Sequence, residues 1–202
     1  MKLISLGGVG GCNLAFALRK LNQPTYPYNW LISTQSFVID SFLKFENFFE
    51  IDEKYLHGKQ TLLNKNKTAI MLHDFKKFDK NEVTDKFKRR YSRLKDAMQA
   101  SEGVLFIRAM EDLEVPMIPE GKYDDIFKRE EDQIQLWSEF LNQQQNKFNK
   151  EIKMLLLAHN EKLVKTTNNP NLFVKYVEKT YGNRRQERPN VGRIVKTIKE
   201  YL

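Results

Sequence analysis

Residues 3–22 of the chain read LISLGGVGGCNLAFALRKLN. The apolar run 3–7 predicts a short buried strand, and residues 12–22 predict a helix because their apolar side chains recur at helical spacing. The glycines between the two segments favour a tight turn, since glycine adopts positive φ angles without a steric penalty. This stretch therefore predicts a strand, a turn and a helix, with Cys12 at the N-terminus of that helix.

The same alternation continues along the chain. Apolar runs at 103–110 and 152–160 predict further strands, and helical patterns cover residues 35–50, 81–100 and 128–148. Continuous apolar strands that alternate with helices are typical of a parallel sheet covered on both faces. We therefore predict an α/β fold with a largely parallel central sheet and flanking helices. The length of 202 residues suits a single α/β domain over residues 1–202.

Four other segments have weaker signals. The stretch 61–75, TLLNKNKTAIMLHDF, predicts either two strands around residues 64–67 or one strand after a loop. Residues 171–179 alternate between apolar and polar and predict an edge strand, and the last twelve residues predict an amphipathic helix. The long connection 111–127 follows a strand end, which is where ligands tend to bind in parallel sheets.

The numbers of cysteines and histidines exclude several kinds of disulfide and metal site. One cysteine excludes an internal disulfide framework and a cysteine-rich zinc site, and three scattered histidines make a metal cluster unexpected. We expect no metal and no cofactor. No stretch reaches the roughly 18 apolar residues of a membrane span, so no membrane partner is expected. The lone cysteine fits a reducing compartment, and we expect a cytoplasmic protein, in the host cytoplasm if it is viral.

The chain is basic, with a net charge of +8. Such a charge permits contact with nucleic acid, but no nucleic-acid motif accompanies it, so nucleic acid is not an expected partner. One compact cluster near the C-terminus could bind an anion or form a solvated face. Its members are Arg184, Arg185, Arg188 and Arg193.

The glycine-rich turn has three interpretations. A lipoprotein signal would need about 7 to 15 apolar residues before the cysteine, and only LISLGG precedes the Val9–Cys12 box. A dinucleotide fingerprint would need glycine at position 13, which is Asn13. The third interpretation makes Cys12 a nucleophile, because the partial positive charge and free N–H groups of a helix N-terminus stabilise a thiolate. The alternative is a buried cysteine that packs as a small apolar side chain.

An ordered set of motifs resembles one protein family. The set runs from ISLGGVGGCNLAFALRK and YPYNW through SFVIDSFLKFENFF and LHDF to RRYSRL and VLFIRAM. It is similar to a family of papain-like cysteine peptidases found in bacteria and large DNA viruses. The resemblance covers roughly residues 3–110 and implies an α/β fold with thiol chemistry. Asn29 stands where the family has an Asp before Trp30. The spacing from glycine to Cys12 is about two residues longer than in the family if Gly7 is the counterpart, and it fits if Gly8 or Gly11 is.

The resemblance implies roles for specific residues. Cys12 would be the nucleophile and His73 the base that accepts its proton, since His73 ends an apolar strand-like run. His57, in a charged loop, and His159, after a strand near the other end of the chain, are less suited to act as this base. Asn29 or Asp74 would orient the imidazole, and we favour Asn29 because neighbours in a strand point to opposite faces. The alternatives are a structural histidine and an Asn that caps its own loop.

Three arginines are candidates for binding a substrate or an anion. Arg90 and Arg93 lie three apart on one predicted helix, and Arg108 interrupts an apolar strand near its carboxyl end. A solvated face with salt bridges is the alternative for the first two. Tyr28 and Trp30 are predicted to anchor the loop in the core.

These observations predict a cysteine peptidase or a related thiol-dependent hydrolase or acyl transferase. Its substrate would be a peptide or protein, and the sequence does not determine the oligomeric state. The alternative is a noncatalytic or transferase-like α/β module that binds a phosphorylated or anionic ligand, such as a nucleotide sugar. That module would use the glycine turn, Arg108 and the basic C-terminal segment.

Overall fold

The fold is taken from a computed structural model of the whole chain. It describes residues 1–8, 11–48, 51–56, 59–64, 69–71, 80–110, 134–158, 161, 164, 167–181, 187–189 and 191–202.

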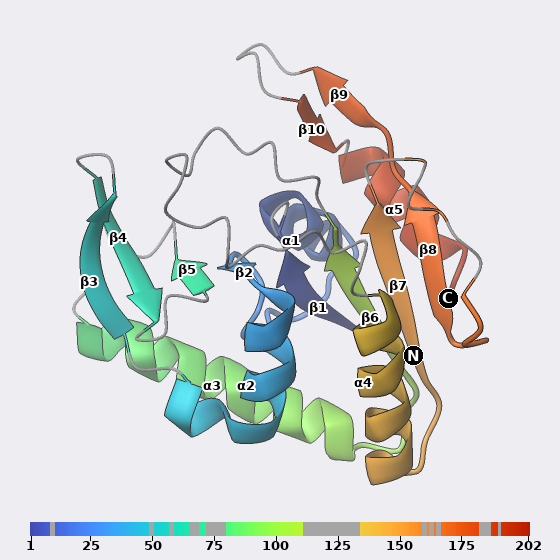
Figure 1. Ribbon diagram of the computed structural model, residues 1–202, viewed down its shortest axis with the longest axis horizontal. Helices are drawn as coiled ribbons and strands as arrows, with labels where there is room; N and C mark the ends of the chain where they lie inside the picture. Colours follow the sequence, from blue (N-terminus) through green and yellow to red (C-terminus); the bar gives the residue numbers. More distant parts are fainter. Residues whose placement is uncertain are drawn as a thin grey trace.

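The centre of the molecule is a four-stranded parallel sheet (Figure 1). Its strands are β1 (Lys2–Gly8), β6 (Val104–Ala109), β7 (Ile152–Ala158) and β8 (Leu172–Tyr176), in the order β1-β6-β7-β8. All three neighbouring pairs are parallel. The predicted α/β class is confirmed, and β8 lies at an edge of the sheet as its alternating pattern predicted.

Helices cover both faces of this sheet (Figure 1). One face packs against α1 (Gly11–Lys20) and α5 (Val191–Lys199). The other packs against α2 (Gln35–Phe48), α3 (Lys80–Gln99) and α4 (Ile134–Phe148). The result is a three-layer arrangement with two separate cores, one on each side of the sheet.

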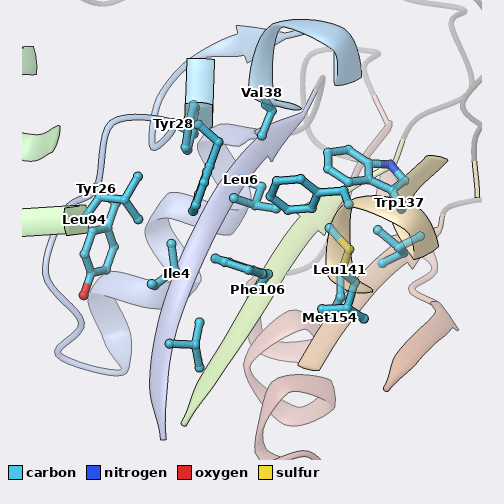
Figure 2. Packing of buried hydrophobic residues seen from close by; sticks show 14 of the residues in the cluster. Ile4, Leu6, Tyr26, Tyr28, Val38, Leu94, Phe106, Trp137, Leu141 and Met154 are labelled. Carbon is cyan, nitrogen blue, oxygen red and sulfur yellow. The ribbon is translucent and has the colours of Figure 1, made fainter. Parts of the chain in front are cut away.

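The two cores follow from the alternation of side chains along each strand. In β6, Leu105 and Ile107 join the core under α1 and α5, whereas Val104 and Phe106 join the core under α2, α3 and α4. Figure 2 shows the second core, where Phe106 lies among side chains from β1, α3, α4 and the loop before α2. Every residue of β6 is buried, which explains why its sequence is apolar apart from Arg108.

A second, antiparallel sheet lies beside β1, in the order β2-β5-β4-β3. It is made of β2 (Ile32–Ser33), β3 (Ile51–Leu56), β4 (Lys59–Asn64) and β5 (Ala69–Met71). Of the two alternatives for residues 61–75, the pair of strands is correct. Neither β2 nor β3 was predicted, because β2 is two residues long and β3 (IDEKYL) is rich in charge.

Two further differences concern the ends of elements. The helix predicted over 35–50 is interrupted at Lys44, whose backbone is not helical (φ −140°, ψ 45°), and α2 ends at Phe48. The start predicted for α4 at residue 128 and the connection 111–127 lie outside the described residues. A short antiparallel pair, β9 (Lys179–Tyr181) and β10 (Glu187–Pro189), follows β8 and was not predicted.

Candidate functional site

The carboxyl end of β1 approaches its neighbours unusually closely. Gly7 and Gly8 have φ angles of 72° and 120°, which favour glycine, and the register between β1 and β6 shifts at this point. A Cβ built on Gly8 would overlap the carbonyl oxygen of Ala109, the last residue of β6. A Cβ on Gly7 would lie 3.0 Å from Ser33 Oγ. Both positions therefore need glycine if the end of β1 is to pack against β6 and β2.

The first helix starts immediately beyond this close contact. The bounds of α1 begin at Gly11 and include Cys12 in the first turn. The side chain of Cys12 lies outside what the structure describes, so its contacts and its activation stay predictions. The start of α1 belongs to the carboxyl edge of the parallel sheet, which is where ligands bind in this class of fold.

The loop between α1 and β2 is closed by Asn29. This side chain is 3% exposed, and its Oδ1 accepts a hydrogen bond from the Tyr26 N–H at 2.9 Å. The Asn29 N–H donates in turn to the Tyr26 carbonyl at 3.2 Å. These are the contacts of the loop-capping alternative. An orienting role of Asn29 towards His73 stays a prediction.

Tyr28, in the same loop, is a core anchor as predicted. It is fully buried, and its hydroxyl lies 3.1 Å from Ser41 Oγ in α2. Burial raises the pKa of Tyr28 well above its usual range, and the hydrogen bond with Ser41 opposes this only in part. The phenol therefore stays protonated and neutral inside the core.

Trp30 departs from the prediction that it anchors the core. It is only partly buried, and its φ angle of 69° is unusual for a bulky side chain. Its ring meets the ring of Phe16 edge to face, with centroids 4.9 Å apart, and Phe16 in α1 is 46% exposed. Phe16 lies four positions after Cys12, and residues four apart share one helix face. That spacing predicts that Phe16 lies on the Cys12 face of α1, whereas its contact with Trp30 has no local sequence signal.

Arg108 is the best-defined of the predicted site residues. It is fully buried in β6, and its guanidinium donates to the Leu6 carbonyl at 2.9 Å and to the Ser33 carbonyl at 2.8 Å. It also lies over the ring of Trp137 in α4, 5.1 Å from the ring centre. Arg108 thus connects β6 to β1, β2 and α4. This burial favours a structural role over contact with a ligand, and anion binding by Arg108 stays a prediction.

Two side chains near Arg108 have polar atoms without a partner. Ser33 Oγ and Trp137 Nε1 are buried, and neither has a hydrogen-bond partner among the described residues. Ser33 lies against Gly7, so a hydroxyl with free hydrogen-bonding capacity sits beside the end of β1. Sequence patterns did not single out Ser33, because its neighbours come from distant parts of the chain.

The other two arginines lie on α3. Arg93 donates to the Thr25 carbonyl at 2.7 Å, and the Arg90 guanidinium lies 5.3 Å from the centre of the Phe87 ring. Lys150, just before β7 starts, donates to the carbonyl of Ala97 near the end of α3 and to that of Ala100 just beyond it. Arg93 therefore lies towards the amino edge of the sheet, away from the start of α1. Substrate binding by the two arginines stays a prediction.

The remaining candidates lie outside the described residues. They are His73, His57, His159, Asp74, Arg184 and Arg185. Of the rest of the basic cluster, Arg188 belongs to β10, and Arg193 in α5 forms an ion pair with Glu178. Within the described ranges, no group of three or more potential ligands (His, Cys, Asp or Glu) could hold a metal ion.

Comparisons with other proteins do not add to this description. The chain matches no family model, and neither a curated protein nor a solved structure matches it. Among the helices that the structure describes, none has the length and apolar character to cross a membrane.

Proposed function

We propose that the chain is a cysteine peptidase, or a related thiol-dependent hydrolase or acyl transferase, with Cys12 as nucleophile and His73 as its base. The proposal is supported by the position of α1 at the carboxyl edge of the sheet, directly after the close contact between Gly8 and Ala109. This arrangement allows a substrate carbonyl to approach the first turn of α1.

The pairing of β5 with β2 is the observation that carries the proposal. Ser33 of β2 pairs with Ala69 of β5, and Ser33 also lies against Gly7 at the end of β1. Neighbouring strands lie about 4.8 Å apart, so β5 runs close to this end of β1. His73 is four residues beyond Ala69, and four extended residues span at most about 14 Å. This reach permits the proposed contact of His73 with Cys12.

The chemistry follows from these two groups. His73 takes the thiol proton, and the thiolate of Cys12 attacks the substrate carbonyl carbon. Free N–H groups in the first turn of α1 donate to the oxyanion. The carbon–nitrogen bond then breaks, the leaving amine takes the proton from His73, and a thioester remains. Water hydrolyses this thioester, or an acceptor amine takes the acyl group in a transferase.

The aromatic pair gives the proposed site an apolar wall. Phe16 shares a helix face with Cys12 and is 46% exposed, and Trp30 contacts its ring. An apolar substrate side chain next to the scissile bond can pack against these two rings. We therefore expect Phe16→Ala to raise KM for substrates with a bulky apolar side chain at that position.

Alkylation of the single cysteine tests the proposal directly. Iodoacetamide labelling is followed by mass spectrometry over a range of pH, with Cys12→Ser as the unlabelled blank. An activated Cys12 reacts well below the usual thiol pKa of about 8.5, and His73→Ala moves its profile back towards that value. His159→Ala is the matched control and leaves the profile unchanged. An ordinary thiol profile in the unaltered protein contradicts the proposal.

A further inference from the structure

A polar cleft lies between α4 and the segment that precedes β8. Helix α4 covers the face of the central sheet opposite to α1, the helix that carries Cys12. The volume of the cleft is about 720 Å³, within the usual range of about 300–1,000 Å³ for small-molecule sites. Most of its lining consists of side-chain amides, and we call it the amide cleft. The amide residues are Gln135, Asn142, Gln145, Asn168, Asn169 and Asn171.

The rest of the lining is neutral as well. Ser138 and Thr167 contribute hydroxyl groups, and Ile134 and Pro170 contribute apolar surface. No Lys, Arg, Asp, Glu or His is among the described residues that line the cleft. The chain as a whole carries a net charge of +8, so a neutral lining is unlike its general composition. A charged ligand would gain no ion pair here, whereas a neutral polar ligand finds many hydrogen-bonding groups.

The wall of the cleft is fixed by internal hydrogen bonds. Asn169 is 9% exposed, and its Nδ2 donates to Ser138 Oγ and to Asn142 Oδ1, each at 3.0 Å. Its Oδ1 accepts from the Asn171 N–H at 3.0 Å. Thr167 Oγ1 shares its one proton between the carbonyls of Asn169 and Leu172, at 2.9 Å and 2.7 Å. These bonds hold the segment before β8 against α4, so the cleft is formed before any ligand arrives.

The same bonds determine which groups are left for a ligand. Asn142 uses its Oδ1 to accept from Asn169, which leaves its Nδ2 as a donor. Gln145 donates from Nε2 to the Ile152 carbonyl at 2.7 Å, and Gln135 donates from Nε2 to Glu139. Both therefore keep Oε1 as an acceptor. Ser138 accepts from Asn169 and keeps its hydroxyl proton to donate. The α4 side of the cleft thus presents two donors, on Ser138 and Asn142, between two acceptors, on Gln135 and Gln145.

We propose that the amide cleft binds a neutral saccharide. Each sugar hydroxyl both donates and accepts, so neighbouring hydroxyls can meet the two donors and the two acceptors of this row. Ile134 and Pro170 can contact the C–H face of the ring. An extended peptide is recognised mainly by backbone pairing with a strand edge, and the described lining stops at Asn171, before β8 begins. The proposal does not depend on thiol chemistry at Cys12.

Amide resonances of the cleft offer a direct readout. ¹⁵N-labelled protein is titrated with maltose, cellobiose and diacetylchitobiose, each to saturation or to its solubility limit. At least one of these sugars should shift the side-chain amide signals of Asn142 and Gln145. Asn142→Leu should weaken that binding about tenfold, since a ligand hydrogen bond and a polar wall group are lost. Asn146→Leu is the matched control, because Asn146 is exposed on α4 outside the lining.

Three results would overturn the proposal. The first is that none of the three sugars shifts these signals. The second is that a neutral alanine peptide shifts them and the sugars do not, which would make the cleft a peptide site. The third is equal sugar binding by the Asn142→Leu and Asn146→Leu variants while both keep the unaltered backbone spectrum. Gln145→Leu supplies a second cleft variant if Asn142→Leu disturbs the fold.

Discussion

The two faces of the central sheet are packed with different chemistry. The face under α1 and α5 has an aliphatic core, whose fully buried members are Leu, Ile, Val and Ala. The face under α2, α3 and α4 is aromatic, and Phe106 meets Phe42 edge to face with centroids 5.5 Å apart, next to Phe140 and Trp137. The aromatic face also includes buried polar groups, since the Arg108 guanidinium lies over the Trp137 ring and donates to the Ser33 carbonyl.

The two faces therefore hold their neighbouring elements in different ways. The aliphatic face holds α1, the helix that carries Cys12, by non-directional packing alone. The aromatic face supplies directional contacts, since Arg108 there binds the end of β1 and β2 at once. We therefore expect substitutions on the aliphatic face to change stability only. Substitutions on the aromatic face should change both stability and the geometry around the start of α1.

The largest effect is expected for Phe106→Ala. Phe106 and Leu105 are neighbours in β6, both fully buried, and they point into opposite cores. Phe106→Ala should cost about 4 kcal/mol of unfolding free energy and Leu105→Ala about 3 kcal/mol, because Phe106 also loses ring contacts with Phe42 and Phe140. Urea unfolding of both variants measures the difference. An equal or larger loss for Leu105→Ala would mean that the ring contacts add nothing.

Arg108→Met should have the next largest effect. It leaves the Leu6 and Ser33 carbonyls buried without their donor, at a cost of about 2–4 kcal/mol. It should also change the alkylation rate of Cys12, because the end of β1 is no longer held. Ile107→Val on the aliphatic face should cost about 1 kcal/mol and leave that rate unchanged. If Arg108→Met is as stable as the unaltered protein, the buried guanidinium is not a stabilising connection.

Tyr28→Phe should cost about 1 kcal/mol near neutral pH, since the hydrogen bond with Ser41 is lost. The pH dependence gives a second readout. Burial raises the pKa of Tyr28, so its contribution to stability is complete below the unfolded value of about 10 and is lost as the pH rises further. Unfolding measured at neutral and alkaline pH should show a smaller alkaline loss in Tyr28→Phe. Ile107→Val should keep the unaltered slope, and an unchanged slope in Tyr28→Phe would contradict the assignment.

The smallest effect is expected for Arg193→Gln. Arg193 in α5 pairs with Glu178, and both side chains are about half exposed (49% and 53%). Exposed ion pairs contribute about 0–1 kcal/mol, and salt screens them. Thermal unfolding should show a small fall in Tm at low salt that disappears at high salt. A large, salt-independent loss would show that Arg193 contributes to the aliphatic core through packing.

The strands of the central sheet could be predicted because they are buried on both faces. Such strands have nearly continuous apolar sequences, interrupted only by Arg108 in β6 and Lys153 in β7, and their prediction needs no knowledge of their partners. The strand β3 (IDEKYL) has no such signal, since charged and apolar residues are mixed within it. The interruption of α2 at Lys44 has no sequence signal either, because no Pro or Gly occurs in this helix.

The candidate site was harder to predict than the fold. That Asn29 closes its own loop was among the alternatives, since Asn side chains commonly bind nearby backbone. The hydrogen-bond partners of Arg108 could not be predicted from the sequence, because the Leu6 carbonyl lies 102 positions away in the chain. Local patterns report periodicity within an element, whereas the contacts of Arg108 depend on which strands become neighbours.

The pairing of β1 with β6 also has a consequence for the synthesis of the chain. Lys2 pairs with Val104, so β1 waits for the ribosome to add about a hundred residues before its partner exists. At roughly 5–20 residues per second this takes about 5–20 s, during which an apolar strand has no sheet to join. Late pairing of distant segments also slows folding. Strand β1 can thus pair only after β6 has been made, and slower translation should lower the yield of folded protein.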